Sequence, residues 1–67
     1  MLGLGIRVRE ARLRAGLTQE ELSFSAGVTQ HYLSHAEGGH RNITVGALRR
    51  LAAEMGVTLS KLLEGLG

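Results

Sequence analysis

The 67-residue chain has no cysteine, no proline and no tryptophan, and apart from histidine its only aromatic residues are one Phe and one Tyr. Without cysteine it has no disulfide and no thiolate metal site, which fits a reducing compartment. No apolar run approaches the ~20 residues that a membrane-spanning helix needs. Arginines recur between Arg7 and Arg14, where a signal peptide would need an apolar stretch. We therefore expect a soluble cytoplasmic protein, folded as one domain over residues 1–67 with a core at about 4–64.

An excess of one charge is also lacking, because eight Lys and Arg oppose six Asp and Glu, for a net charge of +2. Seven of the eight cations are arginine, and four of them lie between Arg7 and Arg14. Arginine suits bidentate contacts with phosphate better than lysine does. A partner that carries phosphate explains this bias, and a genome rich in G and C explains it equally well.

The chain repeats one pattern four times: an aliphatic residue, Thr, three variable residues and Leu, as LTQEEL, VTQHYL, ITVGAL and VTLSKL. Thr caps a helix N-terminus by accepting a backbone hydrogen bond, and the aliphatic residue before it packs on the Leu. Glycines at 16, 27, 38–39 and 56 suit the left-handed conformation that ends a helix. No segment alternates like a strand, so the pattern predicts an all-α fold with five short helices, near residues 5–15, 19–26, 30–37, 45–55 and 59–64.

The second and third predicted helices start only 11 residues apart, with the turn Gly27-Val28-Thr29 between them. So short a turn makes the two helices cross at a steep angle, as in a helix-turn-helix. At 100° per residue, one side of the third helix carries Leu33, Ala36 and Glu37. The other side carries Gln30, His31, Ser34 and His35. Amide and imidazole groups match the donor and acceptor patterns that base edges present in the major groove of DNA.

Three blocks of the sequence, GLTQEEL, AGVTQ-YLS--E-G-RN and LRRLAAEMGV, resemble the phage-repressor and Cro-type helix-turn-helix proteins, also called the xenobiotic-response-element (XRE) family. The resemblance extends over about residues 4–64. It implies a compact five-helix domain that binds a short palindromic operator in double-stranded DNA as a homodimer, with the recognition helix at about 30–37. Small stand-alone regulators such as restriction-modification controller proteins resemble this plan. Under this resemblance we expect a transcriptional regulator without cofactor, metal or small-molecule ligand.

The resemblance also implies roles for individual residues. It assigns base contacts to Gln30, His31 and His35. It assigns contacts with the DNA backbone to Gln19, Thr29, Tyr32, Ser34, Gly39, His40, Arg41 and Asn42. It matches Arg12 and Glu37 to a buried salt bridge between the first and third helices.

The chain departs from the family pattern at four places. Ala36 stands where a larger apolar residue is usual, so the recognition helix is expected to lie slightly closer to the core. Phe24 and Ser25 replace the commoner small or charged residues, and Phe24, the only Phe, is expected to fill that space. Ile43 replaces a frequent proline. His31 and His35 are uncommon at base-contacting positions, so the preferred DNA sequence cannot be copied from a relative.

Other functions remain open. His31 and His35 are four residues apart, with His40 close behind, a spacing that can hold a metal ion. Tyr32 stands where the H-E-x-x-H motif has Glu, and Glu37 is on the inner side, so contact with DNA is the preferred interpretation over a metal site or a merely solvated face. Nothing places an acid to orient a histidine beside a serine, so we expect no enzyme.

A protein-binding role is the alternative from another class: an antitoxin or adaptor with the same fold. Such a protein would need an arm to wrap its partner, and we expect only residues 1–3 and 65–67 to lie outside the domain. The regulator is therefore preferred. The last two predicted helices carry more leucines than one small domain can bury, which indicates a dimer interface with Leu59, Leu63 and Leu66 as candidates.

Overall fold

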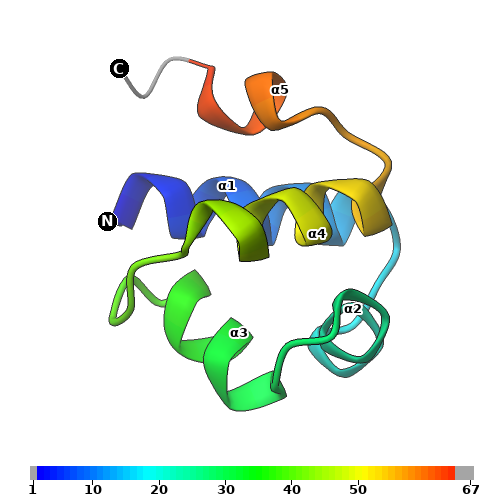
Figure 1. The fold of residues 1–67 in the computed structure, drawn as a ribbon, viewed down its shortest axis with the longest axis vertical. Helices are drawn as coiled ribbons and strands as arrows, with labels where there is room; N and C mark the ends of the chain where they lie inside the picture. The colour runs from blue at the N-terminus through cyan, green and yellow to red at the C-terminus, as the bar shows by residue number, and fades with distance from the viewer. Residues whose placement is uncertain (1, 65–67) are drawn as a thin grey trace.

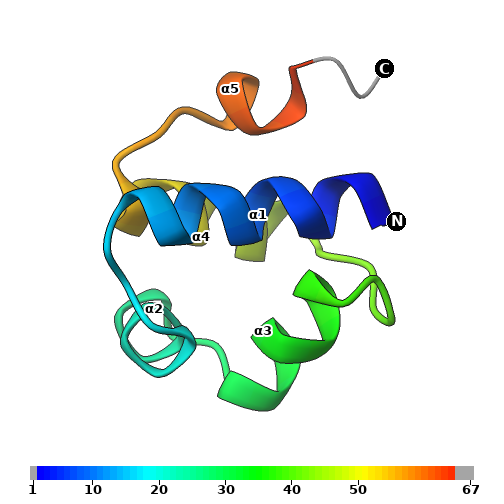
Figure 2. The same cartoon turned by 180° about the vertical axis from the view of Figure 1, so that it is seen from behind.

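The computed structural model describes residues 2–64, which form five α-helices. These are α1 (Leu2–Arg14), α2 (Gln19–Ala26), α3 (Gln30–Glu37), α4 (Val45–Met55) and α5 (Leu59–Leu63). Helices α1 and α4 run side by side through the middle, with α2 and α3 below them and α5 above, as Figures 1 and 2 show from opposite sides. The predicted all-α fold with a helix-turn-helix is confirmed. Within residues 2–64 no helix is both long enough and apolar enough to span a membrane.

Four of these helices begin at a threonine N-cap, as the repeated pattern predicts. In each, the threonine side-chain oxygen accepts a hydrogen bond from the backbone N–H three residues later, at Thr18, Thr29, Thr44 and Thr58. The backbone N–H of Thr18 in turn donates to Glu21 Oε1 at 2.9 Å, which completes a capping box. The predicted bounds 19–26, 30–37 and 45–55 are therefore confirmed.

The first and last helices differ slightly from their predicted bounds of 5–15 and 59–64. Helix α1 starts at Leu2, earlier than predicted, and it ends at Arg14. The sequence has no threonine before this helix that could have indicated its start. Gly16 then adopts a left-handed conformation with φ of 74°, which turns the chain toward α2. Helix α5 ends at Leu63 because the backbone of Glu64 is already extended.

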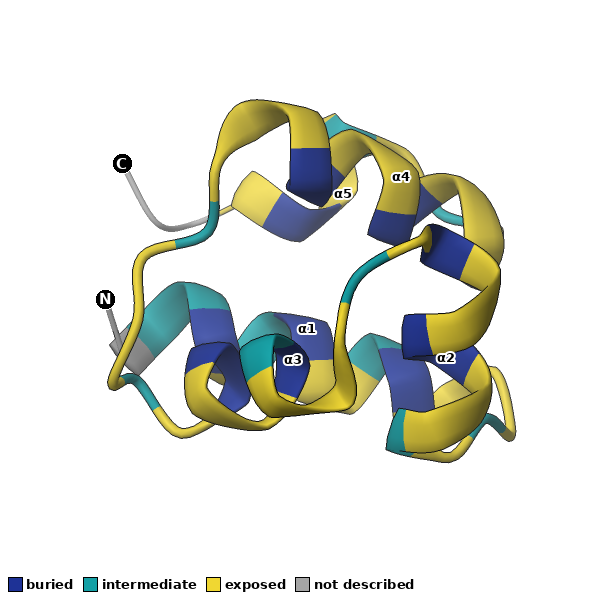
Figure 3. Cartoon of the chain, turned by 60° about the horizontal axis from the view of Figure 1, so that its bottom comes forward, coloured by how far each residue is buried: buried dark blue, intermediate teal, exposed yellow. Residues whose placement is uncertain are grey.

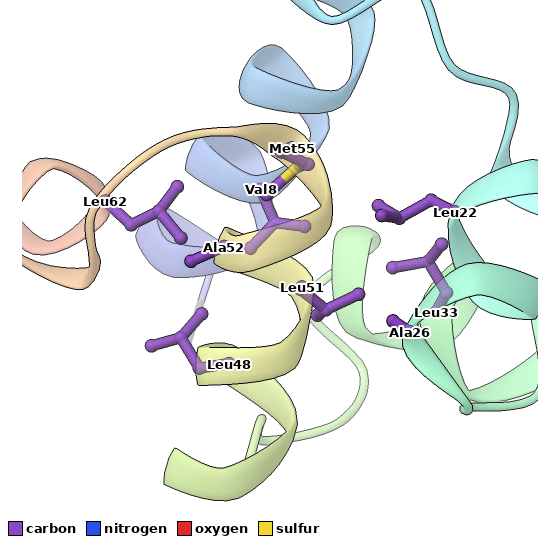
Figure 4. Packing of buried hydrophobic residues seen from close by; sticks show 9 residues of the cluster. All are labelled: Val8, Leu22, Ala26, Leu33, Leu48, Leu51, Ala52, Met55 and Leu62. Atoms are coloured by element: carbon purple, nitrogen blue, oxygen red, sulfur yellow. The ribbon is translucent and has the colours of Figure 1, made fainter.

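Buried residues occur on all five helices, as Figure 3 shows. In the close view of Figure 4, Leu51 of α4 points toward Leu22, Ala26 and Leu33 of the helix-turn-helix. The rest of the cluster is Val8 from α1, Leu48, Ala52 and Met55 from α4, and Leu62 from α5. Helix α4 thus packs against α2, and this contact fixes the position of the helix-turn-helix on the rest of the fold.

Helices α1 and α3 meet at Gly5. A Cβ atom at this position would overlap the carbonyl oxygen of Ala36 and lie 3.0 Å from that of Glu37. The two helices can approach this closely only because residue 5 has no side chain. Helix α1 therefore lies directly against the backbone at the end of α3, where Ala36 is buried. The expectation that Phe24 fills the space beside Ala36 is wrong, since the Phe24 side chain points outward from α2 and is 88% exposed.

Candidate nucleic-acid interface

Helix α3 has a buried side and an exposed side. Leu33, Ala36 and Glu37 are buried against the other helices. The exposed side carries Gln30, His31, Ser34 and His35. It therefore presents an amide, a hydroxyl and two imidazoles, all groups that both donate and accept hydrogen bonds.

The imidazole rings of His31, His35 and His40 form a row along this exposed side, which we call the histidine row. The ring centroids of His31 and His35 lie 4.1 Å apart, with the planes tilted by 40°. The ring of His40, from the segment after α3, lies 6.2 Å from that of His35 in an edge-on arrangement. Among residues 2–64 no three His, Asp or Glu side chains are grouped so that they could share a metal ion.

A buried ion pair lies on the inner side of α3. Arg12 Nε donates to Glu37 Oε2 at 2.7 Å, and Arg12 Nη2 donates to Glu37 Oε1 at 3.0 Å. The two side chains are only 10% and 3% exposed. Arg12 Nη1 also donates to the carbonyl oxygen of Leu17 at 2.9 Å. The pair therefore joins α1, the end of α3 and the loop before α2, and Glu37 is not free to bind a metal.

Gln19 opens α2 and contacts the same buried pair. Its Nε2 atom donates to Glu37 Oε1 at 3.1 Å. The primary amide carries two N–H donors, so one bond to Glu37 leaves another for an outside acceptor. This connection fixes the Gln19 side chain at the start of α2. This bond could not be predicted from local sequence patterns, because the two residues are 18 positions apart.

Tyr32 connects α3 to the start of α4. Its hydroxyl oxygen accepts a hydrogen bond from the backbone N–H of Thr44 at 3.2 Å. The guanidinium carbon of Arg41 lies 5.3 Å from the centroid of the Tyr32 ring, a cation–π contact. Arg41 and Asn42 are both exposed in the segment between the two helices. Tyr32 thus holds one cation of this segment beside the exposed side of α3.

Arg50 is a further cation near this surface that the sequence analysis did not single out. It lines a hollow of about 290 Å³ at the turn between α2 and α3, together with Gly27, Val28, Thr29, Tyr32, Thr44 and Ala47. Its Nη1 atom lies 3.7 Å from the position that a Cβ on Gly27 would take. Helical periodicity places Arg50 on an exposed side of α4 but does not tell which neighbouring element it reaches.

The arrangement of α2 and α3 matches a known family. A family model described as helix-turn-helix matches residues 8–62 of the chain. The chain belongs to the XRE-type helix-turn-helix family. No curated protein sequence matches it.

Solved structures of several other proteins have the same fold. The restriction-modification controller protein C.AhdI from Aeromonas hydrophila is 33% identical, with a TM-score of 0.87 over 91% of this chain and 92% of that one. SinR, a master regulator for biofilm formation solved in complex with DNA, is 31% identical, with a TM-score of 0.86 over 91% and 98%. The controller protein C.Esp1396I is 26% identical, with a TM-score of 0.86 over 97% and 86%.

Proposed function

We propose that this helix-turn-helix protein is a transcriptional regulator that binds double-stranded DNA sequence-specifically, with α3 in the major groove. The observation that carries the proposal is the exposed polar side of α3, backed by a buried ion pair that fixes the helix on α1. The likeness to SinR, which was solved in complex with DNA, supports it.

Base contacts are assigned to Gln30, His31 and His35. The amide of Gln30 matches the paired acceptor and donor of adenine, and an imidazole N–H can donate to N7 or O6 of guanine. All three side chains are exposed on the same side of α3. They are therefore the groups that give this protein its sequence preference.

Contacts with the DNA backbone are assigned to residues around that side, which are Gln19, Thr29, Tyr32, Ser34, Gly39, Arg41 and Asn42. Thr29 and Gln19 are examples that keep a hydrogen-bond donor beyond their present contacts. Thr29 Oγ1 accepts the N–H of Tyr32 at 3.0 Å, which leaves its own hydroxyl hydrogen for a phosphate. Gln19 likewise retains one amide hydrogen. Such contacts fix the position of α3 on the duplex without favouring a base sequence.

Alanine variants separate the two kinds of contact. Gln30→Ala or His35→Ala should remove ~1–3 kcal/mol of discrimination at particular base pairs. Arg41→Ala should weaken binding to all sequences alike and make the slope of log affinity against log salt shallower by about 0.9. The discrimination between duplexes and the salt dependence of affinity are both measured by fluorescence anisotropy with labelled duplexes at several salt concentrations. If Gln30→Ala and His35→Ala lower the affinity for every duplex equally, the assignment of base contacts is wrong.

We further propose that the protein binds a palindromic operator as a homodimer. On α5, Leu62 is 3% exposed and packs in the core, whereas Leu63 is 43% exposed. Leu59 is partly buried and packs against the hydrophobic core of the same protein chain. Leu66 lies outside the described residues. The outward Leu63 is therefore the best-supported interface residue. Twofold pairing would present two α3 helices to major grooves ~10 base pairs apart.

Sedimentation velocity tests the dimer. The parent protein should sediment as a dimer at micromolar concentration, and Leu63→Glu should sediment as a monomer and lose affinity for the palindrome. Leu13→Glu, at an exposed leucine of α1, is the matched control and should remain dimeric. A parent that stays monomeric, and binds one half-site as tightly as two, contradicts the proposal.

A further inference from the structure

The chain folds back at the end of α3 and places residue 40 over the last turn of the helix. The backbone N–H of His40 donates to the carbonyl oxygen of His35 at 2.8 Å, and that of Gly39 donates to Ala36 at 3.2 Å. Gly39 adopts a φ of 80°, in the left-handed region that glycine favours. The backbone of His40 is therefore fixed relative to His35.

The His40 ring lies close to the position that a Cβ on residue 38 would take. A Cβ on Gly38 would come within 3.1 Å of His40 Cδ2, closer than an ordinary van der Waals contact. Glycine at position 38 therefore leaves room for the ring to turn back along α3, toward the ring of His35 at 6.2 Å.

We propose that His40 is a positioning residue for base recognition: its ring orients His35, and through His35 it orients His31. This inference rests on the proposed function, because His31 and His35 must contact bases. An exposed imidazole otherwise samples several rotamers, and ordering it on binding costs affinity. Contact within the histidine row limits those rotamers before DNA arrives. The direction of the ring N–H groups, and hence the preferred base, then depends on His40.

The family resemblance assigns His40 to the DNA backbone, and the two roles need different chemistry. A phosphate contact needs a hydrogen-bond donor at residue 40, whereas orienting His35 needs a flat ring there. His40→Phe keeps a ring and removes the donor, and His40→Gln keeps a donor and removes the ring. His40→Ala removes both. The side chain is exposed, so all three variants should melt near the parent temperature.

The experiment measures each variant against a set of duplexes that carry every single base-pair change within the parent's preferred site. His40→Ala and His40→Gln should lose at least about fivefold discrimination at the base pair that His35→Ala also affects. His40→Phe should retain it. The salt dependence of binding should stay at the parent value in all three, because no phosphate contact is lost. In a His35→Ala background, His40→Ala should have no further effect on discrimination.

A measurement without DNA checks the ring contact itself. In NMR spectra of the free protein, His40→Ala should shift the ring proton resonances of His35. His40→Phe should also shift these resonances, by a different amount, because a different ring then lies beside His35. Unchanged His35 resonances in both variants would show that the rings do not touch and would overturn the proposal.

The binding outcomes separate this inference from the proposed function. A parent that prefers no sequence refutes the proposed function, and the role of His40 falls with it. A parent with clear preference whose His40→Ala variant keeps that preference refutes the positioning role alone. A His40→Gln variant that behaves like the parent, with His40→Phe behaving like His40→Ala, shows a direct contact by His40 and also overturns the inference.

Discussion

Removing either partner of the Arg12–Glu37 pair is expected to destabilise the protein severely. The Glu37 carboxylate is 3% exposed and accepts hydrogen bonds from Arg12 and from Gln19. After Arg12→Ala it would stay buried with Gln19 as its remaining partner, and the carbonyl of Leu17 would lose its bond too. After Glu37→Ala the guanidinium keeps only the bond to Leu17.

The magnitude follows from the burial of the pair. Leaving one charge of a buried pair without its partner costs ~3–5 kcal/mol. A domain of 67 residues has a free energy of unfolding of about 3–10 kcal/mol in total. In a domain of this size each kcal/mol lowers the melting temperature by ~4–8 °C. We therefore expect each single variant to melt at least about 12 °C below the parent, or to be unfolded at 25 °C.

Thermal unfolding followed by circular dichroism measures the effect. A double variant, Arg12→Leu with Glu37→Leu, is the control, because it removes both charges and leaves apolar groups in their place. It should be more stable than either single variant, since replacing a whole buried pair is often neutral. Single variants that melt within a few degrees of the parent would show that Arg12 and Glu37 do not form a buried, coupled pair in solution.

Other variants test contacts that are equally specific. Gly5→Ala should lower the melting temperature and weaken DNA binding, because its Cβ would overlap a backbone carbonyl of α3. The control variant Gly46→Ala, whose Cβ meets no atom within 4 Å, should not destabilise the protein. Equal losses of stability in the two variants would contradict the close approach of α1 and α3. Phe24→Ser should change stability by no more than ~0.5 kcal/mol, because the ring lies outside the core; a large loss on thermal unfolding would place it inside. Tyr32→Phe should cost ~0.5–1.5 kcal/mol through loss of the bond from the Thr44 N–H, and chemical denaturation that finds no loss would show the bond to be absent in solution.

The helices could be predicted from the sequence because their ends are set by local interactions. Thr29, for example, caps α3 through a hydrogen bond to the N–H of Tyr32, only three residues away. The division of α3 into a buried side and an exposed side also follows from the helical repeat, which places Leu33 and His35 on different sides. Where a local signal is missing, as before Leu2, the predicted bound is wrong by a few residues.

The remaining features depend on contacts between residues far apart in the sequence. Gly5 gives no local sign that its missing side chain admits the end of α3, and Gln19 gives none that its amide bonds to Glu37. The outward direction of Phe24 was missed for the same reason, because filling a space in the core depends on where α1 lies. The resemblance to a family supplied the Arg12–Glu37 pair, which periodicity could not.

Sequence-specific recognition of DNA by α3 is best tested by selection of bound sites from a pool of random duplex DNA, followed by a footprint on the selected duplex. We expect an enriched consensus of two half-sites related by twofold symmetry and ~10 base pairs apart, each protected on the side that faces α3. If the selected duplexes share no enriched sequence, and the amount bound depends only on the salt concentration, α3 does not recognise DNA sequence-specifically.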